Sequence, residues 1–243
     1  MLGLGVSFYK VGGDQDFWDP MRVTPDPKGW YKASKIVAGE EGEGGVPAVS
    51  WADSSTKGNN LTQGAEESRG TIDVTEDGAL LLDGTSDHYD FGTAVTISAQ
   101  EAFIGFFVIK LADVDQDTLL GTGATTGFVE IQNNKRLRIK IDSTQEVIIF
   151  GTAQFSSDEK MVLTIQREAG STGNINVFKN GTLLTPTSQL DNAGAINFDS
   201  LGLRDDDRYF GGHIYEVIIY DTEDMESADI TRVCDYLKNH HGI

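Results

Sequence analysis

Short apolar segments alternate with turn residues along most of this sequence, and that spacing is its strongest structural constraint. Segments such as 103–111, 174–179 and 212–220 have the length of single strands. Asn180-Gly181 follows one of them, and this dipeptide favours a two-residue hairpin turn because both positions need positive φ. Glycine is abundant, at 28 residues against five prolines, which suits many tight turns. The pattern predicts an all-β antiparallel sandwich or jelly roll.

Two of these segments also indicate which faces of the sheets are buried. Segment 103–111 is apolar at nearly every position, which predicts a strand covered on both faces. In segment 136–141, Leu137, Ile139 and Ile141 alternate with basic residues. That alternation predicts a strand with one dry and one wet face, paired in a hairpin with segment 128–132.

Only the C-terminal segment has a helical pattern. Ile230, Val233, Cys234 and Leu237 follow the i, i+3, i+4, i+7 spacing of one helix face. Acidic residues precede this stripe and Lys and His residues follow it, as the helix dipole favours. We therefore predict a short α-helix that ends near Gly242, with Cys234 buried as a small hydrophobic residue.

Charge and cysteine content exclude several classes of protein. The chain has 19 Lys and Arg against 38 Asp and Glu, a net charge of −19. This charge repels nucleic acids and anionic membrane surfaces, so we predict neither as a partner. Cys234 is the single cysteine, which excludes an internal disulfide. No segment has the apolar length of a membrane span, and the start lacks the features of a signal peptide, so we expect synthesis in a cytoplasm.

Residues 1–47 differ from the rest of the sequence. They hold four of the five prolines and a glycine–acid run at 39–45, and no strand or helix period persists across them. Aromatic residues spaced by prolines predict an extended N-terminal arm that docks on another surface. The alternatives are a loose tail, or a pair of edge strands belonging to the main domain. Because aromatic residues concentrate at interface centres, we predict partner contacts at Phe8, Tyr9, Phe17, Trp18, Trp30 and Tyr31.

Three segments resemble a known family. They are Trp51–Thr62, the stretch LLLDGTSDHY at Leu80–Tyr89, and the stretch GHIYEVIIY at Gly212–Tyr220, which precedes a helix carrying Tyr236-Leu237. Together they resemble the signature of concanavalin A-like, laminin-G-type jelly rolls. The resemblance implies one jelly-roll domain over residues 48–243. It leaves function open, because this fold occurs in lectins, glycosidases, adhesion proteins and phage virion proteins.

The opening segment Met1–Lys10 is similar to the starts of structural proteins of tailed phages, especially marine, cyanophage-like ones. This resemblance implies a non-enzymatic structural protein located in the virion, as part of the capsid, neck or tail appendage. Its expected partners are other virion proteins, bound through the arm, and further copies of itself. The alternative is a carbohydrate-binding adhesin module that attaches to a host-surface glycan. Trp18 and Trp30 separate the two hypotheses: a protein–protein seam favours the first, an exposed groove the second.

Motifs for catalysis and metal binding are incomplete. Glycosidases of this fold carry Glu-x-Asp-x-x-Glu on one strand, but no Glu here has Asp two residues later. Asp113–Asp117 begins like a calcium loop, yet Thr118 and Ala124 stand where glycine and glutamate are required. The adjacent carboxylates of Asp205–Asp207 point in different directions, and the four histidines share no metal-ligand spacing. We predict no catalytic residue, no metal site and no cofactor.

Overall fold

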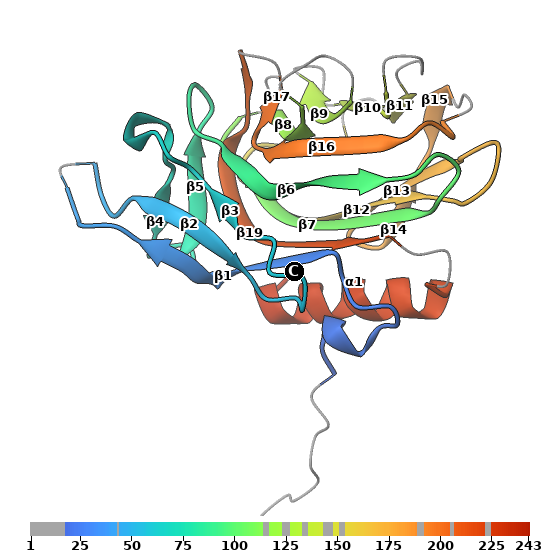
Figure 1. Ribbon diagram of the computed structural model, residues 1–243, viewed down its shortest axis with the longest axis horizontal. Helices are drawn as coiled ribbons and strands as arrows, with labels where there is room; N and C mark the ends of the chain where they lie inside the picture. Colours follow the sequence, from blue (N-terminus) through green and yellow to red (C-terminus); the bar gives the residue numbers. More distant parts are fainter. Residues whose placement is uncertain are drawn as a thin grey trace, which may run out of the picture.

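The chain folds into two facing β-sheets with one α-helix packed beneath them (Figure 1). The computed structural model describes residues 18–42, 44–113, 117–122, 127–132, 136–142, 148–150, 154–188, 192–204, 207–221 and 225–243. All pairings between described strands are antiparallel. The predicted all-β sandwich with a short C-terminal helix is confirmed.

The sheet nearer the helix is built around β19 (Gly211–Tyr220) and β7 (Phe103–Leu111). Further strands of this sheet are β4 (Thr71–Asp73), β5 (Ala79–Asp83), β12 (Lys160–Arg167), β13 (Ile175–Lys179) and β14 (Thr182–Leu184). The predicted turn between β13 and β14 is confirmed, because Asn180 and Gly181 have φ values of 52° and 82°.

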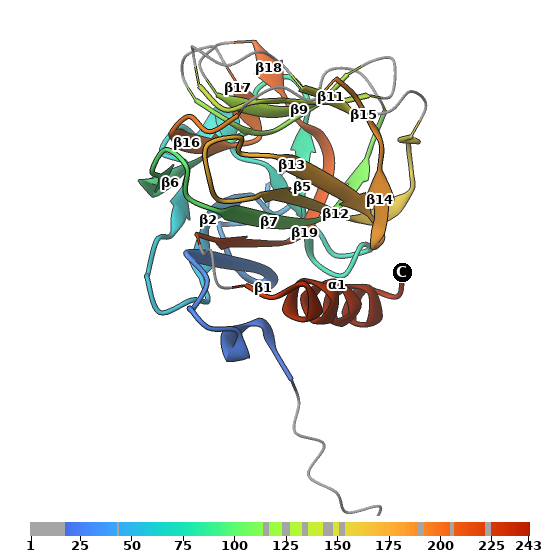
Figure 2. The same ribbon diagram turned by 90° about the vertical axis from the view of Figure 1, so that its right-hand side faces the viewer.

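The second sheet lies on the far side of the first from the helix (Figure 2). It contains β3 (Leu61–Thr62), β6 (Tyr89–Ile97), β8 (Asp117–Gly121), β9 (Phe128–Gln132), β10 (Arg136–Lys140), β11 (Ile148–Phe150), β15 (Pro186–Ser188) and β16 (Ile196–Leu201). A small ribbon of β17 (Leu203–Arg204) and β18 (Arg208–Tyr209) stands at its edge. The chain also has two short 3₁₀ turns, η1 (Pro20–Arg22) and η2 (Glu66–Ser68).

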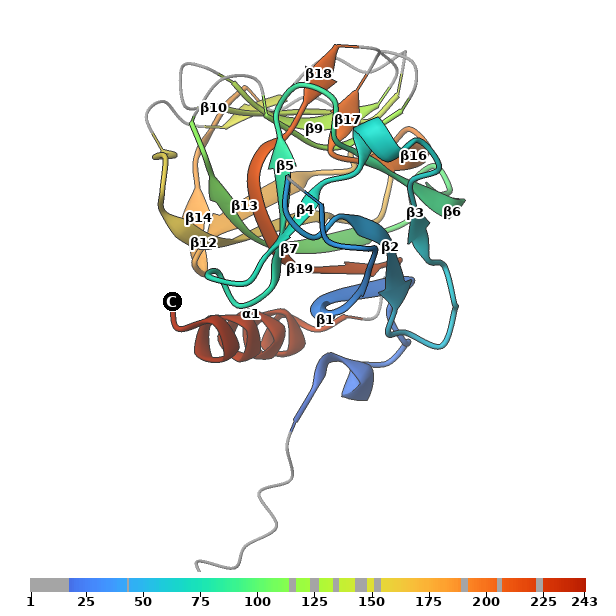
Figure 3. The ribbon, with the colours of Figure 1, turned by 90° about the vertical axis from the view of Figure 1, so that its left-hand side faces the viewer.

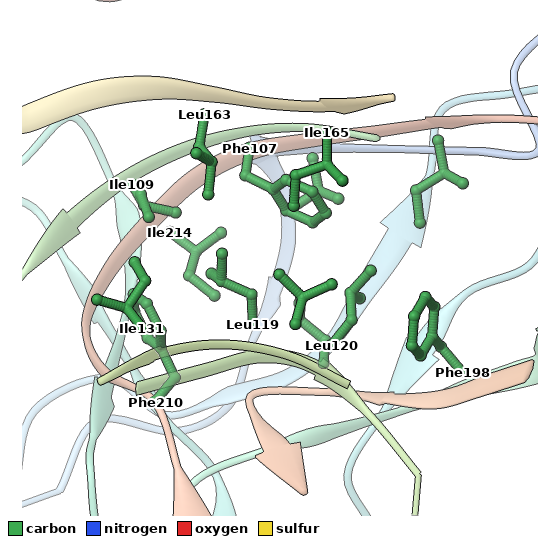
Figure 4. Close-up of a cluster of buried hydrophobic side chains, with 14 of the residues drawn as sticks. Phe107, Ile109, Leu119, Leu120, Ile131, Leu163, Ile165, Phe198, Phe210 and Ile214 are labelled. Carbon is green, nitrogen blue, oxygen red and sulfur yellow. The ribbon is translucent and has the colours of Figure 1, made fainter. Parts of the chain in front are cut away.

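The main hydrophobic core fills the space between the two sheets (Figure 4). Phe107 and Ile109 of β7 and Ile214 of β19 point into it from one side, and Leu119 and Leu120 of β8 meet them from the other. The alternate residues of β7, including Phe106 and Val108, face the helix instead. Strand β7 is therefore covered on both faces, as its continuous apolar sequence predicted.

Helix α1 (Ser227–His241) covers the outer face of the β19 and β7 sheet. Its stripe of Val233, Cys234 and Leu237 is buried, and Gly242 closes it in a left-handed conformation at φ 67°. The prediction of an amphipathic C-terminal helix with a buried Cys234 is confirmed. No helix in the part of the chain that the structure describes combines the length and apolar character needed to cross a membrane.

The boundary at residue 47 requires a correction. Strand β1 (Gly29–Ala38) pairs with β19 over Gly29–Lys32, and with β2 (Ala48–Asp53) at Tyr31 and again over Ile36–Ala38 (Figure 3). Tyr31 is fully buried in the sandwich core, where its ring meets Trp51 and Phe91 edge to face. Residues 29–38 thus belong to the jelly roll, which agrees with the alternative of strands of the main domain and not with an arm.

The segment Leu80–Tyr89, which carried part of the family resemblance, forms a structural turn. Oδ1 of Asp83 accepts hydrogen bonds from the backbone N–H groups of Thr85, Ser86 and Asp87. In return, the backbone N–H of Asp83 donates to Oδ2 of Asp87 at 3.0 Å. Burial raises the pKa of the Asp87 carboxyl to about 6, and the charge of Asp83 adds to the rise.

A substitution at Ile219 tests the strand register. Ile219 is fully buried in the main core, so Ile219→Ala should lower the free energy of unfolding by about 2–5 kcal/mol. Leu183→Ala is the matched control, because Leu183 is 57 % exposed and its loss should change stability by less than about 0.5 kcal/mol. Urea unfolding measures both. Equal losses at the two positions would contradict the register.

Deletion of residues 1–47 should prevent folding, because it removes β1, leaves one edge of β19 unpaired over Glu216–Ile219 and leaves the space of Tyr31 empty. Circular dichroism and urea unfolding provide the measurement. A chain that begins at Trp18 keeps every residue the structure describes and serves as the control. A cooperative unfolding transition in the shorter chain would restore the boundary at residue 47.

The Asp87 carboxyl should make stability depend on pH. Its folded pKa of about 6 exceeds the unfolded value of about 4, so the folded state binds more protons between these values. Its contribution to stability therefore decreases as pH rises from about 4 to about 6. Asp87→Asn keeps an oxygen acceptor for the Asp83 backbone N–H and does not titrate. Urea unfolding of this variant should therefore show a smaller decrease in the free energy of unfolding over this pH range than the natural chain shows. Parallel pH profiles for the two proteins would contradict the assignment.

Candidate functional site on the C-terminal helix

The predicted partner-binding aromatics do not lie together on one exposed surface. Phe8, Tyr9 and Phe17 lie outside the described residues. Tyr31 is in the sandwich core, and Trp30 is only 3 % exposed beneath the helix layer. Trp18 alone among the described members is half-buried at the surface, beside α1.

A short anchored turn holds Trp18 in place. The next residue, Asp19, caps η1 by accepting a hydrogen bond from the backbone N–H of Met21 at 2.9 Å. The hydroxyl group of Tyr220, from β19, donates to the backbone oxygen of Pro20 at 2.9 Å and is buried. Trp18 and Met21 then pack against the cluster between sheet and helix.

An open groove of about 820 Å³ lies along the outer face of α1. Its lining residues share one face of the helix because they follow the three- and four-residue spacing of helical neighbours. They are Arg232, Asp235, Tyr236, Asn239 and His240, together with Trp18 from the N-terminal turn.

Three aromatic rings form the apolar part of this groove. The Trp18 and Tyr236 rings meet edge to face, with centroids 6.0 Å apart and planes at 63°. The His240 ring stacks on Tyr236, with centroids 5.7 Å apart and planes only 6° from parallel. Burial raises the pKa of Tyr236, so its hydroxyl group stays protonated and can donate a hydrogen bond.

Polar side chains border these rings. Arg232 offers N–H donors, Asp235 offers carboxylate acceptors, and the Asn239 amide offers both. Arg232 also forms an exposed ion pair with Asp229 at 3.0 Å. An aromatic platform with such a polar border suits a ligand that presents an apolar face surrounded by hydroxyl groups.

A smaller cavity of about 290 Å³ lies on the other side of His240. It is lined by Lys32, Ala33, Ser34, Asp77, Tyr215, Glu216, His240 and His241. From sequence, His240 and His241 were expected only to interact with the helix dipole, and Tyr236 had no expected role beyond the family signature. The four-residue spacing of Arg232, Tyr236 and His240 places them on one helix face, and this spacing in the sequence could have indicated the groove.

Two other hollows lie among the described residues. A rim hollow of about 530 Å³ between Lys57, Asn59, Thr93 and Asp221 has no aromatic side chain among its described lining residues. A hollow of about 360 Å³ separates the inner side of α1 from β13 and β14, with Phe178 on its wall.

The acidic segments examined for calcium fall partly outside the described residues, at 114–116 and 205–206. Of their described members, Asp117 is 1 % exposed, and its Oδ1 accepts a hydrogen bond from the backbone N–H of Gly211 at 2.8 Å. That bond fixes the start of β19, which is a structural role.

Comparison with known proteins identifies the fold. No protein-family model and no curated protein matches the sequence. The structure is similar to domain 4 of AbnA, a GH43 extracellular arabinanase from Geobacillus stearothermophilus, solved in complex with arabinotriose. The TM-score is 0.52 and the identity 14 %, over 86 % of this chain and 98 % of that one. The chain therefore has the fold of an antiparallel β-sandwich.

Two toxin domains are also similar. The receptor-binding domain of botulinum neurotoxin type G matches with a TM-score of 0.50 and 15 % identity, over 77 % of this chain and 48 % of that one. The binding domain of serotype D matches with a TM-score of 0.50 and 16 % identity, over 84 % and 51 %. The jelly roll thus spans about half the length of these toxin domains. At such identities the likeness shows the fold alone.

Proposed function

We propose that this jelly roll is a non-catalytic carbohydrate-binding module whose glycan site is the groove on the outer face of α1. The observation that carries the proposal is the aromatic platform of Trp18, Tyr236 and His240 in an open groove. Trp18 lines an exposed groove, which favours the hypothesis of a glycan-binding module over that of a virion structural protein. An arabinanase domain solved with arabinotriose and a toxin's receptor-binding domain share the fold, which supports a binding role.

The chemistry of the groove suits a sugar. One face of a sugar ring presents C–H groups that pack on aromatic rings, while its hydroxyl groups hydrogen-bond at the ring edge. Arg232, Asp235 and Asn239 border the platform where those hydroxyl groups would lie. A volume of about 820 Å³ falls within the range of small-molecule sites and leaves room for a short oligosaccharide.

A binding role fits this groove better than hydrolysis. Glycosidases use two carboxyl groups on either side of the scissile bond. Asp235 is the single carboxylate among the described residues that line the groove. A virion location rests on the resemblance of Met1–Lys10, which lies outside the described residues, and it stays a prediction.

Substitutions in the platform test the proposal. After a glycan array has identified a ligand, Trp18→Ala and Tyr236→Ala should each weaken binding about tenfold, since each removes roughly 1.4 kcal/mol of stacking and burial. Tyr236→Phe keeps the ring and should bind nearly as the natural chain does. Isothermal titration calorimetry measures the affinities.

Lys57→Ala is the control, because Lys57 lines the rim hollow and not the groove. Circular dichroism establishes that every variant is folded. The proposal is wrong if no glycan on the array binds. It is equally wrong if Lys57→Ala weakens binding while the two platform variants leave it unchanged.

A further inference from the structure

Strand β19 has a bulge at the point where it passes under the end of α1. Its register with β7 shifts between Ile214 and Glu216, which leaves Tyr215 as the extra residue. Ile214 and Val217 both face the sandwich core, so the two residues between them, Tyr215 and Glu216, both face the helix side. Bulges commonly redirect a side chain in this way, often at functional sites.

The redirected Glu216 carboxylate is buried, with 1 % of its side chain exposed. Its Oε1 accepts a hydrogen bond from the Trp30 indole Nε1–H at 2.6 Å. Its Oε2 lies 2.8 Å from Nε2 of His241, which is itself 7 % exposed. A buried carboxylate is costly unless a partner group compensates its charge, and the His241 imidazole lies where such a partner is needed.

His240 brings a second imidazole to the same place. Its ring stands at 88° to the ring of His241, with centroids 4.8 Å apart. The possible ligand atoms of Glu216, His240 and His241 all lie within 4.8 Å of one another. His240 is exposed and lines both the groove and the smaller cavity, so the aromatic platform and this cluster share one residue.

We propose that Glu216, His240 and His241 form a binding site for one zinc ion. Two imidazoles and one carboxylate are a donor set that Zn²⁺ takes in proteins, at about 2.0–2.2 Å from each ligand atom. The ion would lie between Nε2 of His241 and Oε2 of Glu216, in place of their direct contact. The smaller cavity, of about 290 Å³, leaves room for a water molecule as the fourth ligand.

The surroundings support this site. The Trp30 N–H holds the second oxygen of Glu216, as outer partners orient metal-binding carboxylates elsewhere. The net charge of −19 raises the local concentration of cations. Lys32 is the competing cation: it lines the cavity, and its ammonium lies over the Trp30 ring, 4.0 Å from the centroid.

Zinc titration of the full chain tests the proposal. After dialysis against a chelator, isothermal titration calorimetry with ZnCl₂ should show one equivalent bound. His240→Ala is the deciding variant, because His240 is exposed and its loss should leave the fold intact while weakening binding at least about tenfold. Glu216→Gln should weaken it further, and Lys32→Gln should strengthen it. Co²⁺ in place of zinc should give the visible absorption of a four-coordinate site.

His88→Ala is the control, because His88 bonds to Gln63, away from this cluster. The proposal is overturned if the natural chain binds no zinc at about 100 μM, a weak affinity for a protein site. It is also overturned if His240→Ala binds zinc as the natural chain does. Trp18→Ala should leave zinc binding unchanged, so failure of the glycan proposal and failure of this one give different results.

Discussion

Strand β19 is the element on which the rest of the structure depends. It pairs along one edge with β7 and along the other with β5 and then β1. Ile214, Val217 and Ile219 supply the sandwich core from one face, and Tyr215, Ile218 and Tyr220 supply the helix-side cluster from the other. Because other strands pair with both edges of β19 and both of its faces are packed, β19 positions the second sheet on one side and the helix on the other.

The bulge in β19 connects the fold to the site. A regular strand would place Glu216 in the sandwich core, where a carboxylate has no polar partner. The extra residue turns it toward Trp30 and His241 instead. Tyr220, further along the same strand, holds η1 through Pro20 and so positions Trp18. The platform and the histidine cluster are therefore arranged by one strand.

Local sequence patterns predicted those elements in which each face has the same burial along the whole element. The Asn180-Gly181 turn, the two-face burial of β7 and the apolar stripe of α1 each depend on neighbours in sequence. Strand β1 was missed because its environment changes along its length: Gly29–Tyr31 are buried, and most later positions are half-buried or exposed. Such a strand has no period of two, and its pairing with β19, almost 190 residues later, cannot be inferred from local pattern.

The candidate site was hidden for the same reason. Trp18 and Trp30 come from the start of the chain, Glu216 from β19, and Tyr236, His240 and His241 from the last helix. No spacing rule joins these residues, because their distances are set by how β1 and α1 both dock on β19. Trp30, expected to contact a partner, instead buries its ring and donates its indole N–H to Glu216. An aromatic residue in an irregular segment thus indicates burial of apolar area, and only the tertiary pairing decides whether a partner or the protein's own helix layer covers it.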